Sequence, residues 1–445
     1  MEFSHIPEES RRNIFLATGK ALNLQEQVVE KDWWVTKTLQ AMFALPFAHY
    51  ISFKGGTSLS KCWNIIKRMS EDIDVGLNRD FFGMSGELTK NQIKDTLRKK
   101  SCNFVREELP LLLKERFNTL GLDESQYNIY VNCTSVSTVD PETVYISYKS
   151  LFEQNPYVDT EVKVEVSSRS MEGPTATIPI KSFVDGVFLD KEFASKEFFV
   201  NAVLPQRTFI EKVFLLHEEF SRGEEKIRTN RMSRHLFDIY MLSQSPMAYQ
   251  ALSNKTLYDA IINHRKTFIM LGGIDYNSLQ AETLNIVPPD SVMDKWREDY
   301  NTMRETMIYD KAPTFDEIIS KLIEINRQVN HIEYKKISPV PTGLLNKSKT
   351  LYEKEQETVR FAIEYATGKG MHTGIKWLQD SFSDLFQISK SEYSIADVFD
   401  ASYMSALFND IINNCSLKLS SLQQNKLNKV GKELGGLGGP GGRSL

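Results

Sequence analysis

The sequence predicts an α+β fold, with a mixed sheet and helices in the N-terminal part and mainly helices after it. Short segments such as "DIDVGL" and "EVKVEV" alternate apolar and polar residues, and strict alternation indicates half-buried strands. Before residue 45, and again from about residue 198 to residue 328, apolar residues recur at helical spacing. The length of 445 residues exceeds one ordinary core and indicates two or three domains.

The N-terminal part is expected to begin with a helical stretch over residues 8–45, which a strand at "HYISF" follows. After the glycine pair Gly55–Gly56, the segment "TSLSKCWNIIKRM" is expected to be helical, and its first Thr and Ser suit an N-cap. "DIDVGL" then predicts a strand. The elements expected after it are a helix over residues 87–120 and strands within residues 127–138, 142–152 and 161–166.

Changes of composition suggest where the domains end. The α+β domain is expected over residues 1–200 and a helical domain over residues 201–335. The segment "KKISPVPTG" contains two prolines and a glycine and is typical of a linker. Beyond it, residues 346–430 predict a helical region of unknown role, and the glycine-rich residues 431–445 predict a flexible tail.

Composition excludes several classes of protein. The hydrophobic fraction of 41% and the charged fraction of 25% are globular values. No apolar run reaches the ~18 residues of a membrane span, and the N-terminus lacks the apolar core of a signal peptide, so a cytoplasmic protein is expected. Because the net charge is −4, any nucleic-acid contact requires a local basic patch. The four cysteines lie far apart without zinc spacing and are expected to be reduced.

Residues 52–77, "SFKGGTSLSKCWNIIKRMSEDIDVGL", combine a glycine pair, a helix start and two aspartates. In a strand, Asp72 and Asp74 share one face, while Ile73, Val75 and Leu77 share the other. Two adjacent carboxylates repel each other, and a divalent cation removes that repulsion. Hard oxygen ligands suit Mg²⁺ or Mn²⁺, which also bind substrate phosphates.

The residues before the aspartates suit a phosphate. Gly55 and Gly56 allow a ligand close to the backbone, and the helix that follows offers free N–H groups. Ser58 adds a hydroxyl donor and Lys54 a positive charge. Either motif alone is usually a plain turn or a solvated strand face. The order strand, glycine pair, helix and aspartate strand instead predicts a nucleotidyltransferase site, and the absence of GxxxxGK[ST] excludes a P-loop.

A third carboxylate would complete a two-metal site. In "EVKVEV", Glu161 and Glu165 share a face with Lys163, opposite three valines. Glu165 is the first choice for this ligand and Glu161 the second. The alternative is an ordinary solvent-exposed face of an antiparallel strand.

Four pieces of the sequence, taken together and in order, resemble the AbiEii/AbiGii-type nucleotidyltransferase toxins, a branch of the DNA polymerase β-like superfamily. The pieces are "EKDWW", "FKGGTSLSK", "KRMSEDIDVGL" and the pair "LPQRTFIEKVFLLHEEF" and "RMSRHLFDIYML". The resemblance covers roughly residues 20–245. It implies a polymerase β-like catalytic domain with a mixed sheet, whose active site the following helical domain completes.

The resemblance also implies roles for single residues. Asp72 and Asp74 would hold the metal, and Glu165 stands where the superfamily often has a third carboxylate. Lys212 would touch the phosphates, and Asp238 would orient Lys212 and the acceptor or act as a base. The residues implied to bind the nucleotide are Lys54, Gly55, Gly56, Ser58, Arg68 and Ser70.

From the pattern alone, Arg234 and Asp238 are four residues apart on a helix and predict an ordinary ion pair worth a few tenths of a kcal/mol. The basic residues near them are either a phosphate grip or a solvated loop; they are Arg222, Lys226, Arg228, Arg231 and Arg234. Arg98–Lys100 form a second candidate patch. The histidines His217 and His235 are interpreted as structural, and the tryptophans Trp33, Trp34 and Trp63 as core residues rather than base-stacking platforms.

The predicted function is Mg²⁺-dependent transfer of a nucleoside monophosphate from a nucleoside triphosphate to an acceptor. By resemblance, the acceptor is an RNA 3′ end such as that of tRNA, and the protein is the toxin of a toxin–antitoxin or phage-defence pair with an antitoxin protein as partner. Two alternatives stay open. The acceptor is a protein or small molecule, or the chain is a non-catalytic nucleotide-binding protein.

Overall fold

The computed structural model of the chain describes residues 3–70, 72–153 and 159–331. Residues 1–333 fall in one compact unit. The predicted domains 1–200 and 201–335 are therefore two parts of this unit, except that residues 334 and 335 fall outside it. The predicted linker, the helical region 346–430 and the tail 431–445 lie outside the described residues.

Seven strands form one mixed sheet in the order β3-β4-β5-β2-β1-β7-β6. Their bounds are β1 Ile51–Lys54, β2 Asp72–Leu77, β3 Tyr127–Val131, β4 Glu142–Tyr148, β5 Glu161–Ser167, β6 Thr175–Ile180 and β7 Phe198–Val203. β2 runs antiparallel to β1 and parallel to β5, and β1 runs parallel to β7. The α+β class with a mixed sheet is therefore confirmed.

Alternation along the strands separates a core face from a polar face, as the sequence predicts. On β2, Ile73, Val75 and Leu77 are buried at 0%, 1% and 3% exposure, while Asp72 and Asp74 are half-buried on the other face. The buried face packs on helices α2 (Glu26–Phe43) and α5 (Leu109–Thr119) in one hydrophobic core. The polar face, which carries Asp72 and Asp74, does not contribute to this core.

The helices of the first part are α1 Glu8–Leu22, α2, α3 Gly55–Lys61, α4 Arg98–Asn103, α5 and α6 Phe183–Val187, with π-helical turns η4 Gln92–Leu97 and η5 Phe104–Glu108 beside α4. The helices of the second part are α7 Pro205–Phe220, α8 Ser233–Ser243, α9 Pro246–Ser253, α10 Lys255–His264, α11 Asp290–Thr306 and α12 Phe315–Asn330, with a π-helical turn η8 Arg265–Ile269 after α10. The 3₁₀ turns are η1 Phe3–His5, η2 Ala48–Tyr50, η3 Arg79–Phe82, η6 Glu124–Gln126, η7 Glu224–Lys226, η9 Tyr276–Leu279 and η10 Ala281–Thr283.

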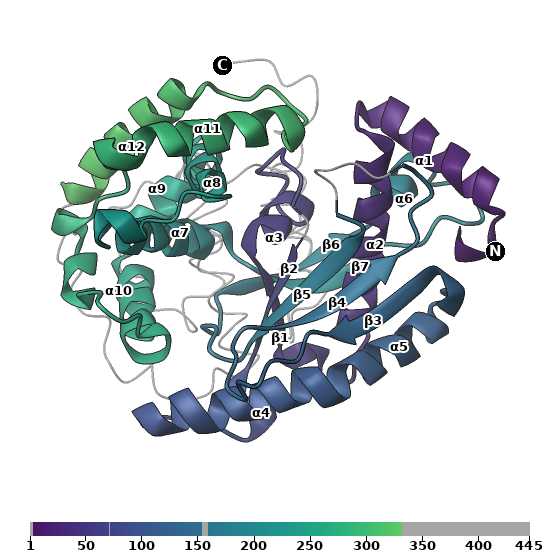
Figure 1. Cartoon of the computed structure of the whole chain (residues 1–445), viewed down its shortest axis with the longest axis horizontal. Helices are drawn as coiled ribbons and strands as arrows, with labels where there is room; N and C mark the ends of the chain where they lie inside the picture. Colours follow the sequence, from purple (N-terminus) through teal and green to yellow (C-terminus); the bar gives the residue numbers. More distant parts are fainter. Residues whose placement is uncertain (1–2, 71, 154–158, 332–445) are drawn as a thin grey trace, which may run out of the picture. The chain divides into compact units, whose positions relative to one another are not determined.

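Figure 1 shows the sheet between two groups of helices. The blue helices α4 and α5 run along one side of it, and the teal and green helices α7 to α12 gather on the other. Within this second group α8 packs against α7, α11 and α12. No helix of the described ranges is both long and apolar enough to cross a membrane.

Three expectations are wrong in detail. Residues 8–45 form two helices, because Asn23 ends α1 in the left-handed conformation, at φ 55°. Helix α3 begins at Gly55 after Lys54, so Thr57 and Ser58 lie inside its first turn and are not the N-cap, and it ends at Lys61, so the rest of the segment expected to be helical, residues 62–69, is not helix. Residues 198–203 form strand β7 instead of helix, because they pair with β6 and β1, a contact that helical spacing within the segment does not reveal.

Candidate active site

Charged side chains from three adjacent strands form one row on the polar face of the sheet. The register places Lys54 of β1 opposite Asp74 of β2, and Asp74 opposite Glu165 of β5. Asp72 lies on the same face, one step along β2, opposite Lys163. The structure therefore brings the two predicted aspartates and the first-choice glutamate together.

The pKa of Glu165 is shifted by its surroundings. Burial, followed by the negative charges of Asp74 and Asp72, raises the pKa of Glu165 to about 7, although Lys54 and Arg234 act against the rise. The second-choice carboxylate, Glu161, lies two strand steps further along the same face and accepts a hydrogen bond from the Tyr130 hydroxyl. Glu165 is thus the glutamate that shares the electrostatic environment of the aspartates.

The glycine pair makes room for side chains of the protein. Gly55 has a φ of +79°, and a Cβ there would lie 2.0 Å from Oδ2 of Asp74. A Cβ on Gly56 would lie 2.6 Å from Nη2 of Arg68 and 3.0 Å from Oγ of Ser70. The distances of 2.0 and 2.6 Å are shorter than real Cβ contacts, so a side chain on either glycine would displace Asp74 or Arg68.

Thr57, which the sequence analysis did not include among the site residues, ties the first turn of α3 to the aspartate strand. Its hydroxyl contacts Oγ of Ser70 at 2.9 Å and donates to the backbone carbonyl of Asp72. Ser58 is buried, at 2% exposure, with its hydroxyl shielded from solvent. Ser58 therefore presents no hydroxyl at the surface of the site, whereas its neighbour Thr57 positions the strand.

A buried ion cluster joins the segment before β2 to helices α7 and α8. Arg68 donates from Nε and Nη2 to the two carboxylate oxygens of Asp238, each at 2.8 Å, and Nζ of Lys212 lies 2.9 Å from Oδ2 of Asp238. Asp238 is fully buried. Burial alone would raise its pKa, but the charges and hydrogen bonds of Arg68 and Lys212 hold that pKa well below its usual range.

The intrahelical pair predicted from spacing alone is not formed. Nη1 of Arg234 lies 3.9 Å from Oδ2 of Asp72, while Asp238 pairs with Arg68 and Lys212. The reason is burial, because Asp238 faces the interior and Arg234 is half-exposed. The pattern showed which residues share a side of α8 but not which cations lie closer to the carboxylate.

The histidines differ in their surroundings. His217 accepts a hydrogen bond from the Asn285 amide at Nδ1, 2.9 Å away, and is structural as expected. His235 lies beside the ion cluster, with Nδ1 3.5 Å from Nζ of Lys212. Burial, then the charges of Lys212 and Arg234, lower its pKa well below the usual value. His235 is therefore a neutral neighbour of Lys212, and no sequence pattern indicated this contact.

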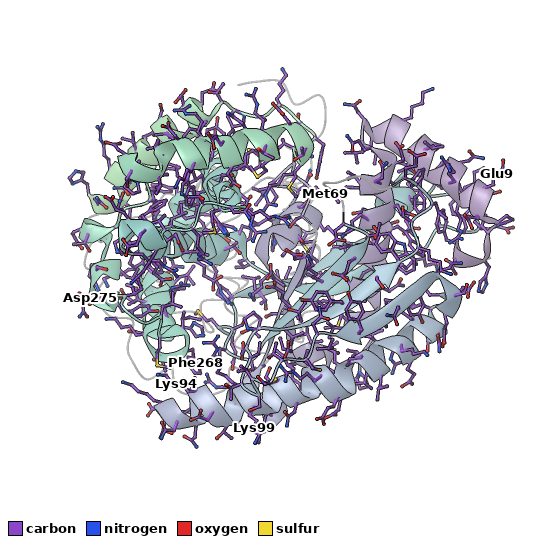
Figure 2. The ribbon with its side chains drawn as sticks, viewed as in Figure 1. Glu9, Met69, Lys94, Lys99, Phe268 and Asp275 are labelled. Carbon is purple, nitrogen blue, oxygen red and sulfur yellow. The ribbon has the colours of Figure 1, made fainter. Side chains whose placement is uncertain are left out.

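A cavity of about 210 Å³ opens beside Asp72. Arg68, Ser70 and Asp72 line it from the aspartate segment, and Arg231 and Arg234 line it from α8 and the loop before α8. Met69, labelled in Figure 2, is another of its lining residues. The cavity is thus bounded by both parts of the compact unit.

The predicted basic segment divides into two groups. Arg222 and Arg228 pair with the buried carboxylate of Glu219, whereas Arg231 and Arg234 line the cavity. Trp33 and Trp34 are buried core residues, at 2% and 3% exposure, and offer no stacking platform. The roles assigned to the site residues in metal and nucleotide binding stay predictions.

Comparisons with known proteins bear on the family of the chain. The family model described as the nucleotidyl transferase AbiEii toxin of type IV toxin–antitoxin systems matches residues 37–321, more than half of the chain. Among solved structures, MenT4, a nucleotidyltransferase toxin from Mycobacterium tuberculosis H37Rv, is similar with 13% identity and a TM-score of 0.35, over 70% of this chain and 98% of that chain. A search of curated proteins finds no match. On the family match, the chain belongs to the AbiEii nucleotidyl transferase toxins of type IV toxin–antitoxin systems.

Proposed function

We propose that this nucleotidyltransferase moves a nucleoside monophosphate from a nucleoside triphosphate to the 3′-hydroxyl of an RNA, with tRNA as the first acceptor to test. The observation that carries the proposal is the row of Asp72, Asp74 and Glu165 beside an arginine-lined cavity. Acidic groups that attract a cation next to basic groups that attract phosphate are what phosphoryl transfer requires.

A divalent cation fits the acidic row. Among residues 3–70, 72–153 and 159–331, no three His, Cys, Asp or Glu side chains form a ready-made metal cluster. Mg²⁺ does not require one, since it commonly takes one or two carboxylates and fills its shell with water and substrate phosphates. Asp72 and Asp74 would hold it, with Glu165 next to them. The register supports this, because it places Glu165 directly opposite Asp74, and the negative charges of Asp74 and Asp72 add to burial in raising the pKa of Glu165. When bound, the cation would neutralise charge on the phosphates.

The buried ion cluster suits the phosphates. Asp238 supplies one negative charge to two cations, Arg68 and Lys212, so the cluster keeps one unit of positive charge. Arg234 also lines the cavity, where it lies 3.9 Å from the Asp72 carboxylate. Asp238 would act as a positioning residue, because its two partners hold its pKa low and leave it a poor proton acceptor. Glu165, which lies opposite Asp74 on the polar face of the sheet, would be the carboxylate that accepts the proton of the acceptor hydroxyl.

The toxin–antitoxin assignment of the family makes an antitoxin the expected partner of this chain. Modification of RNA 3′ ends by the toxin would explain why a cell that carries it requires protection. The antitoxin would then either block the enzyme or reverse its product, and the activity of the isolated enzyme is the first quantity to measure.

A labelling assay tests the proposal. The purified protein is mixed with total RNA, Mg²⁺ and each α-³²P nucleoside triphosphate in turn. We expect label on RNA from the wild type and at least a hundredfold less from the Asp72→Ala/Asp74→Ala variant. The matched control is Asp190→Ala/Asp294→Ala, which removes two exposed carboxylates that line no cavity described here and is expected to keep wild-type activity.

Each other outcome changes the conclusion. Label on a protein band that depends on Asp72 and Asp74 would replace the RNA acceptor with a protein. Full labelling of RNA by the Asp72→Ala/Asp74→Ala variant would contradict the metal site. No label with any nucleotide, in the presence and absence of RNA, would contradict the transfer reaction and favour a nucleotide-binding role.

A further inference from the structure

A second cavity, of about 250 Å³, lies apart from the acidic row. Its walls are two π-helical turns, η4 with Lys94 and η8 with Phe268, together with Arg98 and Arg169. Figure 2 labels Lys94 and Phe268, which approach each other from the two groups of helices. π-helical turns inside helices occur frequently at functional sites, and here two of them face one cavity.

The charge around this cavity is positive and mostly uncompensated. Arg169 is held by the Asp140 carboxylate, 3.7 Å away, and donates to the carbonyl of Phe268 at 3.1 Å. Arg79 lies over the Phe268 ring, 4.9 Å from its centroid. Within the described ranges, Arg79, Lys94 and Arg98 have no carboxylate partner. The Nε atoms of Arg79 and Arg98 are buried and lack a hydrogen-bond acceptor there as well.

Phosphate is the chemistry that these groups suit. Guanidinium groups offer forked N–H donors to phosphate oxygens, and a buried donor without an acceptor gains free energy when an anion supplies one. The Phe268 ring already stacks on His264, with centroids 5.0 Å apart, and lies beneath Arg79. Phe268 therefore positions Arg79, and the cavity is shaped for an anion more than for a base.

The place of the cavity in the fold connects it to the acidic row. Arg79 follows the end of β2 by two residues, and Arg169 follows the end of β5 by two residues. Because β2 and β5 are parallel, with Gly76 opposite Ser167, both arginines emerge at the same end of the sheet. The cavity therefore lies at the end of β2 and β5 that Gly76 and Ser167 mark, beyond Asp74 and Glu165 along the same two strands.

We propose that the cavity around Lys94, Arg98 and Arg169 binds a backbone phosphate of the acceptor polynucleotide, upstream of the reacting 3′ end. The naming of the acceptor as RNA depends on the proposed function, whereas the phosphate site depends only on the geometry and charge of the cavity. The phosphates of the nucleotide donor would remain near Asp72 and Asp74.

Binding, measured without turnover, tests this proposal. The probe is a 5′-fluorescein-labelled RNA hairpin with a single-stranded 3′ tail, titrated by anisotropy over a series of KCl concentrations. We expect Lys94→Glu and Arg98→Glu each to weaken binding about tenfold and to reduce the slope of log K against log salt by about one unit. Lys94 is exposed, so its substitution is a test that leaves the core intact.

The control is Lys99→Glu, which makes the same charge change on α4, at an exposed residue that is not in the cavity lining and is labelled in Figure 2. It is expected to bind RNA within about twofold of the wild type, and all three variants are expected to bind nucleoside triphosphate equally. Equal losses for Lys94→Glu and Lys99→Glu, or no loss for either cavity variant, would overturn the proposal.

Two further outcomes separate this site from other conclusions. If the cavity variants keep RNA binding but lose binding of fluorescein-labelled polyglutamate, the cavity takes an acidic protein segment and the proposal is wrong. If RNA binding depends on Lys94 and Arg98 but no nucleotide is ever transferred to RNA, the phosphate site stands and the proposed function fails. If the cavity substitutions leave the transfer of nucleotide to RNA unchanged, the proposed function stands and the phosphate site is wrong.

Discussion

At the scale of single residues, the glycine pair makes room for neighbouring side chains, a requirement that its sequence pattern does not indicate. The sequence suggested that Gly55 and Gly56 open the backbone to a phosphate. In the structure, a side chain at either position collides first with Asp74 or Arg68. The glycines are therefore needed by the protein itself, because the carboxylate and the guanidinium must lie directly against the start of α3.

Replacement of Gly55 by alanine tests this. Gly55→Ala and the control Gly83→Ala both place a side chain at positive φ, +79° and +67°, but a Cβ on Gly83 meets nothing within 4 Å. The backbone strain, about 1–2 kcal/mol, is common to both. We expect only Gly55→Ala to lose nucleotide transfer by tenfold or more, because Asp74 must move. Equal activity in the two variants would show that the position of Asp74 is not critical.

At the scale of secondary structure elements, the parallel pairing of β2 and β5 creates the acidic row. Asp72 and Asp74 share a face because side chains alternate along β2, and Glu165 joins them because Val164 and Val166 face the core. Each strand by itself only alternates buried apolar and half-buried charged residues. Their pairing brings three carboxylates together on one face, and burial, followed by the charges of Asp74 and Asp72, raises the pKa of Glu165.

This predicts a pH dependence of stability for the metal-free protein. The pKa of Glu165 is about 7 in the folded state and about 4.3 in an unfolded chain. Folding therefore favours the protonated form, and stability falls as pH rises from about 4.3 to 7. Glu165→Gln removes this loss, so the variant is expected to gain on the order of 1–3 kcal/mol over the wild type at pH 8 and much less at pH 5.

The measurement is calorimetric unfolding of wild type and Glu165→Gln in a chelating buffer at the two pH values. Addition of excess Mg²⁺ is expected to raise the melting temperature of the wild type more at pH 8 than at pH 5, because the cation binds the ionised form. If the melting temperatures of the two proteins differ equally at pH 5 and pH 8, Glu165 does not titrate in this range.

At the scale of the whole compact unit, the site is assembled between the sheet and the helices that follow it. The Arg68–Asp238–Lys212 cluster connects the segment before β2 with α7 and α8. Backbone hydrogen bonds join the same segment to the chain after α11, from the Met69 amide to the Met307 carbonyl at 2.7 Å. The candidate site therefore also connects the sheet with the helices that follow it.

Loss of Arg68 should consequently cost stability. Arg68→Ala leaves the carboxylate of Asp238 buried with Lys212 alone, and removal of one partner from a buried pair costs about 3–5 kcal/mol. The control Lys114→Ala breaks an exposed pair with Glu124, both side chains being about half-exposed, and is expected to cost less than about 1 kcal/mol. Urea unfolding measures both. Similar losses of unfolding free energy in the two variants would mean that the Arg68–Asp238–Lys212 cluster does not stabilise the fold.

The sequence by itself determined the local features of the site. The strand "DIDVGL" is confirmed over Asp72–Leu77, and the face shared by its aspartates is confirmed as well. Both follow from the two-residue repeat of a strand, which depends only on neighbouring residues. The family was also recognisable, since its motifs are short runs of sequence, and the family match over residues 37–321 confirms it.

Only the tertiary structure decided which distant groups meet. It paired Asp238 with Arg68 and Lys212 instead of Arg234, placed β7 in the sheet, directed the glycines toward Asp74 and Arg68, and brought η4 against η8 around a basic cavity. Each of these contacts joins segments far apart in the chain. Their free energies come from burial and charge pairing, and no repeat within a segment records them.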